Sequence, residues 1–177
     1  MSKEEFAKDI DKNTFPGAQG GALNNQIAAK AVCFKEALTK EYQDYSHQIL
    51  NNAKALASSF QEQGLRVVSG GTENHLVLVD TRSVDEELTG KEAGILLNEK
   101  GITLNRNSIP FDPRSPFVTS GIRMGTPAVT TCGMKEDELT QVGYLISEIL
   151  KNRLDENRLS ELEEQVRALA KSFQPYG

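Results

Sequence analysis

The sequence feature that most constrains the fold is an uninterrupted apolar run at 76–79, Leu-Val-Leu-Val, which ends on Asp80. A short apolar run of this kind is typical of a strand in a sheet that is covered on at least one face. A long amphipathic helix precedes it, because apolar residues recur every three or four positions over 42–60. The chain is therefore expected to pack helices against a small sheet.

Other local patterns predict the remaining elements. Asn24 or Asn25 is expected to cap a helix that runs to Leu38, and Thr89 with Glu92 forms a capping-box pattern at the start of another helix. The expected helices are 24–38, 41–63, 90–100, a short one entered at Pro127, and two that carry 139–149 and 159–173; the expected strands are 65–68, 75–80, 102–104 and 117–123. This order indicates an α/β layer arrangement, with helices on a small sheet.

Composition excludes several classes of protein. The chain has 177 residues, a net charge of −5, 25% charged and 38% apolar residues, which are ordinary values for one globular domain and exclude general disorder. It has no basic stripe for nucleic acid and no apolar run near the roughly 20 residues that cross a membrane. Residues 1–5 include the charged Lys3, Glu4 and Glu5 and form no apolar signal segment, so we expect a cytoplasmic protein. Cys33 and Cys132 match no metal spacing, so we expect reduced thiols and no metal site.

Three stretches carry residues that suit ligand chemistry. Gly20 and Gly21 precede a predicted helix, where bare backbone amides can bind a phosphate; the spacing alone favours a flexible turn that leads into the helix, because Gly-Gly turns are common. Arg123 lies between two glycines at the expected end of a strand and offers a planar fork for a carboxylate, against the alternative of a surface salt bridge. Asn107, in a polar loop, could meet the edge of a heterocycle or simply form a turn.

Taken together, the motifs closely resemble serine hydroxymethyltransferase from about residue 5 to about residue 150. The matching stretches, in order, are Phe15-Pro16-Gly17-x-Gln19-Gly20-Gly21, Ile27 to Val32, Val68 to Leu76, Leu88 to Ala93, Asn105-x-Asn107-Ser108-x-Pro110, and Ser115 to Ala128. The last stretch is long and nearly unbroken, so that a chance match explains it poorly.

The resemblance implies a pyridoxal-phosphate enzyme of the aspartate-aminotransferase fold (fold type I) that interconverts serine and glycine, with tetrahydrofolate as the one-carbon carrier. Arg123 matches the arginine that binds the substrate carboxylate, and Gly20 and Gly21 match glycines that contact the cofactor phosphate. Asn107 matches the asparagine that meets the folate ring, and Ser115, Pro116 and Phe117 match residues that line the folate pocket.

The resemblance also implies a division of the chain and a missing part. Residues 1–39 would end the large cofactor-binding domain, and 40–177 would form the small C-terminal α+β domain. The family's Schiff-base lysine lies upstream of the Phe-Pro-Gly motif, in a segment that nothing before Phe15 resembles. The chain is therefore expected to be the C-terminal part of such an enzyme, inactive alone, with a homodimer partner or the N-terminal half required.

Some positions depart from the family pattern. Ala22, Asn25 and Cys132 stand where proline, histidine and arginine are common. Two other interpretations stay open: a non-catalytic binding or regulatory remnant, and part of another fold-type-I transferase. The latter would share Arg123 but should lack the folate features at Asn107 and 115–117.

Overall fold

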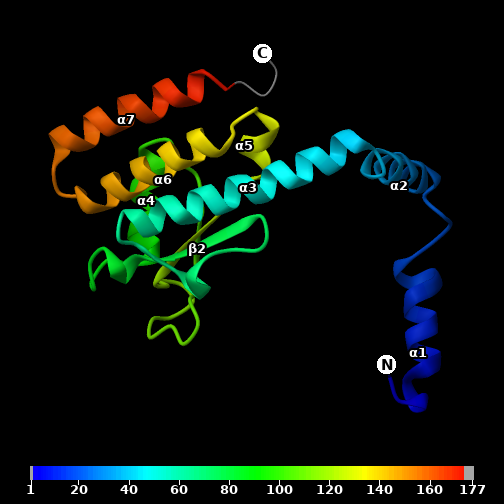
Figure 1. Ribbon diagram of the computed structural model, residues 1–177. Helices are drawn as coiled ribbons and strands as arrows, with labels where there is room; N and C mark the ends of the chain where they lie inside the picture. Colours follow the sequence, from blue (N-terminus) through cyan, green and yellow to red (C-terminus); the bar gives the residue numbers. More distant parts are fainter. Residues whose placement is uncertain (1, 174–177) are drawn as a thin grey trace. The chain divides into compact units, whose positions relative to one another are not determined.

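The computed structural model describes residues 2–173, which divide into two compact units, Met1–Gln43 and Asp44–Gly177 (Figure 1). In the first unit, a 3₁₀ turn (Glu4–Phe6) leads into α1 (Ala7–Lys12), a wider turn (Asn13–Ala18) and α2 (Asn24–Ala37). The backbone of Phe15 and Pro16 is not helical, as their glycine- and proline-rich context predicts. Asn24 is the first residue of α2 and makes no side-chain cap, so the expected asparagine cap is wrong.

The second unit contains a four-stranded sheet in which all neighbouring strands are antiparallel. The strands are β1 (Arg66–Val67), β2 (Leu76–Asp80), β3 (Asn105–Asn107) and β4 (Gly121–Gly125), and their order across the sheet is β1-β2-β4-β3. Parallel strands alternating with helices are thus absent from residues 44–173. The second unit is therefore an α+β domain, as expected for residues 40–177, and the broader prediction of an α/β layer arrangement is replaced by this class.

Five helices of the described chain complete the second unit: α3 (Lys40–Glu62), α4 (Gly90–Glu99), α5 (Pro127–Thr131), α6 (Glu136–Lys151) and α7 (Glu156–Lys171). The predicted capping box of α4 is confirmed, since the Glu92 amide donates to Thr89 Oγ1 and the Thr89 amide donates to Glu92 Oε2, both at 3.1 Å. Pro127 occupies the first turn of α5, as expected. Among residues 2–173, no helix is both long and apolar enough to span a bilayer.

The hydrophobic core lies on one face of the sheet. Val77, Val79 and Ile122 are at most 1% exposed and pack with the apolar faces of the helices, whereas Leu76 and Leu78, which alternate with them, are only half-buried. Figure 1 shows α3, α6 and α7 stacked on the same side of β2. Within residues 44–173, helices therefore cover one face of the sheet, and the opposite face, which carries Leu76 and Leu78, stays partly exposed.

Polar contacts fix the end of β4 against α3. The buried Asn52 amide of α3 donates to Thr130 Oγ1 at 2.8 Å and to the Met134 carbonyl at 2.9 Å. The Thr126 hydroxyl, directly after β4, donates to the Ile49 carbonyl at 2.9 Å. Because buried hydrogen-bonding groups lose solvation unless they are paired, these contacts define where β4 ends.

We predict that residues 39–177, which keep the whole of α3, fold without residues 1–38. In the described chain no residue before Asn52 is buried, and Thr39, whose hydroxyl accepts from the Tyr42 amide, would remain after deletion of residues 1–38. Thermal unfolding followed by circular dichroism should give a melting temperature within about 2 °C of the full chain. Phe60→Ala should destabilise both forms by about 3–5 kcal/mol; a deletion that lowers the melting temperature by more than about 5 °C contradicts the prediction.

Candidate functional site

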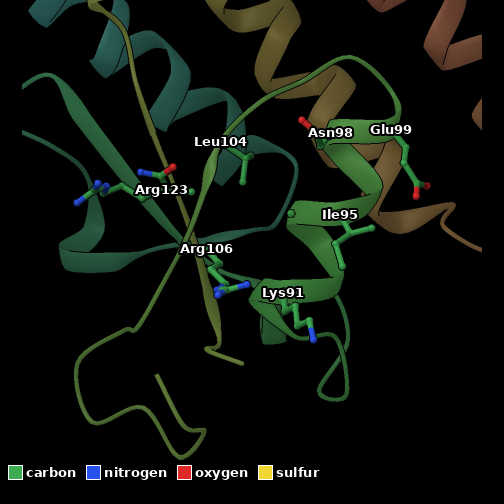
Figure 2. A pocket seen from close by; sticks show the side chains of 9 residues that line it. Lys91, Ile95, Asn98, Glu99, Leu104, Arg106 and Arg123 are labelled. Carbon is green, nitrogen blue, oxygen red and sulfur yellow. The ribbon is translucent and has the colours of Figure 1, made fainter. Parts of the chain in front are cut away.

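Arg123 lies at the centre of β4, with Leu78 of β2 opposite on one side and Asn105 of β3 opposite on the other. The expected strand from Phe117 ending on Arg123 is wrong, because the strand begins at Gly121 and continues to Gly125. Alternation along β4 turns Ile122 toward the core and Arg123 toward the open face. Figure 2 shows the Arg123 side chain extending away from α4.

The Arg123 guanidinium stands in a cavity without a charged partner. The cavity, of about 700 Å³, is lined by residues 68–74 together with Leu76, Leu78 and Arg123. Within residues 2–173, Arg123 is half-buried and makes no ion pair and no side-chain hydrogen bond. By contrast, Arg66 and Arg82 share the Asp80 carboxylate at 2.7 and 2.8 Å. A half-buried guanidinium with its fork open can bind an external carboxylate in two parallel hydrogen bonds.

The loop at 68–74 forms the far wall of this cavity, a role that the sequence did not reveal. Ser69, Gly70 and Gly71 all have positive φ, of 64°, 70° and 151°. The Thr72 hydroxyl donates to the Leu76 carbonyl at 2.6 Å and so closes the turn onto the start of β2. The consecutive glycines are the available signal: two successive left-handed residues fold the chain back over the sheet face.

Asn107 ends the edge strand β3, opposite Gly121. The sequence predicted a strand at 102–104 and a loop that begins at Asn105. The prediction is wrong by three residues, because residues 102–104 link α4 to the strand, which covers 105–107. The Asn107 amide donates to the Ser108 carbonyl at 2.6 Å, and in the described chain its Oδ1 accepts no hydrogen bond. Register places Asn107 and Arg123 on the same sheet face as diagonal neighbours, about 7–8 Å apart between Cα atoms.

Ser115, Pro116 and Phe117 lie in the loop that joins β3 to β4, and all three are exposed, Phe117 to 79%. They form a turn rather than the expected start of a strand, because the Val118 and Thr119 amides donate to the Ser115 carbonyl at 3.0 and 2.9 Å. No hydrogen bond of the described chain joins this turn to Asn107. The structure thus pairs Asn107 with Arg123 on one face and presents 115–117 on the adjoining loop.

Asp112 organises that loop, and sequence reasoning did not single it out. Its Oδ2 accepts from the amides of Ile109 and Ser120 at 3.2 and 2.9 Å, and its Oδ1 accepts from the Arg114 amide and the Ser120 hydroxyl at 3.0 and 2.7 Å. Partial burial alone raises the pKa of Asp112, but these hydrogen bonds outweigh it and lower the pKa to about 2 from 3.8.

Gly20 and Gly21 belong to the first unit, immediately before α2. A Cβ atom added at either glycine would meet no heavy atom within 4 Å, and neither has a positive φ. In residues 2–43 the amides of both glycines make no backbone hydrogen bond. The chain itself therefore leaves these amides open to an external acceptor.

A second cavity, of about 510 Å³, lies at the edge of the sheet between α4 and β3, and Arg123 of β4 also contributes to its lining (Figure 2). Figure 2 shows Arg106 and Lys91 close to each other at one end of it, while Asn98 and Glu99 lie at the other. Arg106 is opposite Ile122 in register and so faces the helix side of the sheet. Arg106 is consequently a neighbour of Arg123 in the sheet with the opposite orientation.

The remaining titratable candidates form no centre in the described residues. Cys33 and Cys132 are free thiols, and residues 2–173 contain no group of three or more side chains able to hold a metal ion. His75 has an exposed side chain at the start of β2. The polar features that converge are therefore those around β4.

The fold and the site define an α+β domain that offers an open guanidinium and an amide on one face of a small sheet. A family model described as Serine hydroxymethyltransferase matches residues 1–146, which is more than half of the chain. The chain belongs to the serine hydroxymethyltransferase family. The match includes the glycines before α2, the loop at 68–74 and all of β4, whereas α7 lies outside it.

The pKa of Asp112 predicts a pH dependence of stability. Because the folded pKa lies below 3.8, Asp112 stabilises the fold fully above about pH 4 and loses that contribution as the pH falls toward 2. The lowering corresponds to about 2 kcal/mol, which solvent screening reduces to about 1 kcal/mol.

Urea unfolding of wild type and Asp112→Asn should therefore differ by a constant free energy from pH 5 to 7, and by less at pH 3. The exposed Asp137→Asn is the matched control for the removal of one surface carboxylate. A gap for Asp112→Asn that widens on acidification would contradict the assignment.

Proposed function

We propose that this chain contributes the substrate-carboxylate arginine and part of the folate site to a pyridoxal-phosphate-dependent serine hydroxymethyltransferase, which interconverts serine and glycine with tetrahydrofolate as one-carbon carrier. The observation that carries the proposal is the half-buried Arg123 guanidinium, which faces a cavity of about 700 Å³ and lacks a partner in residues 2–173. Membership of the family supports the class of reaction.

Arg123 would bind the carboxylate of serine or glycine. Its guanidinium supplies two parallel N–H groups, and a carboxylate returns two oxygens at matching spacing. Leu76 and Leu78 line the same cavity and partly exclude water, so the ion pair would be stronger than one on an open surface. The pairing of β4 with strands on both sides sets the sheet face from which the Arg123 side chain projects, which supports this role.

Asn107 would meet the ring of tetrahydrofolate, with Ser115, Pro116 and Phe117 along its side. The free Oδ1 of Asn107 can accept a hydrogen bond from a ring N–H, and the exposed Phe117 ring can pack against a planar heterocycle. Asn107 lies about 7–8 Å from Arg123 between Cα atoms. This spacing supports a site in which the amino acid and the one-carbon carrier lie side by side.

Gly20 and Gly21 suit the phosphate of pyridoxal phosphate. Their amides are open, no packed atom occupies the place of a side chain, and α2 starts three residues later with the positive end of its dipole. Bound pyridoxal phosphate supplies an electron sink that allows bonds at the amino-acid Cα to break. We propose that residues 1–39 end the cofactor-binding domain and that 40–177 form the C-terminal domain of fold type I.

Helix α2 supports a partner in this assembly, which we propose to be a homodimer. Its exposed apolar residues include Ile27, Val32 and Phe34, which are 56%, 57% and 66% exposed, and no residue of α2 is buried. A helix that is apolar on several sides is typical of a buried position. Contact with a second copy or with the rest of the cofactor-binding domain would cover it.

Residues 1–177 by themselves should have no hydroxymethyltransferase activity. Lys3, Lys8 and Lys12 precede the glycine loop, but their sequence context does not resemble the family's cofactor lysine. Purified chain with pyridoxal phosphate, serine and tetrahydrofolate should form glycine no faster than a protein-free mixture. Turnover above that background would refute this part of the proposal.

In an enzyme assembled from residues 1–177 and a lysine-bearing cofactor domain, Arg123→Ala should raise the KM for serine. Loss of hydrogen bonds to a charged group costs about 1.5–3 kcal/mol, or about 10- to 150-fold. Arg123→Lys should restore only part of it, since an ammonium lacks the planar fork. Arg167→Ala, an exposed arginine of α7 that lines none of these cavities, is the control, and an unchanged KM for Arg123→Ala would exclude the carboxylate role. Activity without tetrahydrofolate dependence would favour another transferase of the same fold type.

A further inference from the structure

The loop between β3 and β4 is more firmly held than its length suggests. It leaves the sheet after Asn107 and returns at Gly121, residues that lie opposite each other in register. Loops of this length without regular structure are usually mobile. Phe117 of this loop is exposed to solvent, yet two partly buried side chains, Asp112 and Arg114, connect the residues before the 115–117 turn to Ser120 after it.

The first attachment is the Asp112 carboxylate. All four of its hydrogen bonds, to Ile109, Arg114 and twice to Ser120, are within the loop or at its end, at 2.7–3.2 Å. Both oxygens act as acceptors for two donors each. An asparagine in this place would turn its NH₂ group toward a backbone N–H in either orientation, so the isosteric amide cannot replace the carboxylate.

The second attachment is the Arg114 guanidinium. Nη2 donates to the Glu86 carbonyl at 2.6 Å, and Nη1 donates to the Leu88 carbonyl at 3.0 Å and to Ser120 Oγ at 3.2 Å. The two carbonyls belong to the segment before α4, whose start is fixed by its capping box. A lysine could not span these three acceptors, because its donors radiate from one nitrogen.

We propose that Asp112 and Arg114 are positioning residues that hold the loop so that Ser115, Pro116 and Phe117 are preorganised beside Asn107. The inference rests on the proposed function in taking the displayed turn to be a folate contact. Asp112 and Arg114 touch no ligand; they act by fixing the chain on both sides of the turn. Preorganisation of a loop raises affinity by removing the entropy cost of ordering it on binding.

The consequence is a separation between the two substrates. Arg123 is held by strand pairing on both sides, independently of the loop, whereas Phe117 depends on Asp112 and Arg114. Loosening the loop should therefore weaken tetrahydrofolate binding and leave serine binding nearly unaffected. A merely structural role would change both substrates alike or neither.

The first measurement is amide hydrogen exchange in the full 177-residue chain, which requires no activity. In Asp112→Asn the amides of Ile109, Arg114 and Ser120 should exchange at least tenfold faster than in wild type, with β2 and α6 unchanged. Arg114→Lys should accelerate amide hydrogen exchange at Ser120 and in the turn at 115–119. The matched controls are Asp137→Asn and Arg106→Lys, which remove no loop contact. Unchanged exchange in both loop variants would overturn the anchoring.

The second measurement is steady-state kinetics in the assembled enzyme. Asp112→Asn and Arg114→Lys should each raise the KM for tetrahydrofolate at least fivefold, with the KM for serine within twofold of wild type. Faster loop exchange with an unchanged KM for tetrahydrofolate would overturn the positioning role. If wild type itself shows no tetrahydrofolate-dependent turnover, the proposed function fails and the positioning of a folate contact fails with it; hydrogen exchange then still decides the anchoring.

Discussion

The pairing of β4 between β2 and β3 is the constraint on which the rest of the second unit depends. Each residue of this strand serves one of two faces: Ile122 is fully buried against the helices, and Arg123 faces the open side. Because side chains alternate along a strand, a shift of one residue would bury the guanidinium and expose the isoleucine. The apolar core on one face thereby fixes the direction of the charged side chain on the other, and stability and the candidate site share a single register.

Helices were the most predictable part of this chain. The apolar periodicity of α3 and the paired Thr89 and Glu92 of α4 are local signals, and the structure places both helices within about two residues of the expected positions. The strand β2 was equally clear, since its apolar run has few alternative structures. The edge strand β3 was not, because Asn105-Arg106-Asn107 is polar throughout and becomes a strand only through its hydrogen bonds to β4. Pairing of that kind leaves no periodic pattern in a single sequence.

The residues of the candidate site likewise fall into those that the local sequence predicts and those that depend on contacts distant in sequence. The sequence singled out Arg123, Asn107 and the glycines before α2 by residue type and through the resemblance to a family. Only the strand register showed that Arg123 and Asn107 lie on the same face of the sheet. The wall at 68–74 and the loop contacts of Asp112 and Arg114 depend on groups distant in sequence: Arg114 reaches the carbonyls of Glu86 and Leu88. Residue type alone could not separate this arginine, whose guanidinium donates to backbone carbonyls, from Arg123, whose guanidinium donates to no group within residues 2–173.

That contrast between arginines separates the guanidinium groups that the domain uses internally from the one that is the candidate for a ligand. Arg66 and Arg82 converge on Asp80, and burial, which alone would raise the pKa of Asp80, is outweighed by their hydrogen bonds, which lower it. These ion pairs engage both guanidinium groups at the end of β2 and leave the cluster with one net positive charge. Within residues 2–173 Arg123 has no such carboxylate partner, so its guanidinium remains open to an external group. The register of β4 therefore determines the sheet face on which the Arg123 guanidinium lies, while its lack of an ion pair within residues 2–173 leaves it unengaged there.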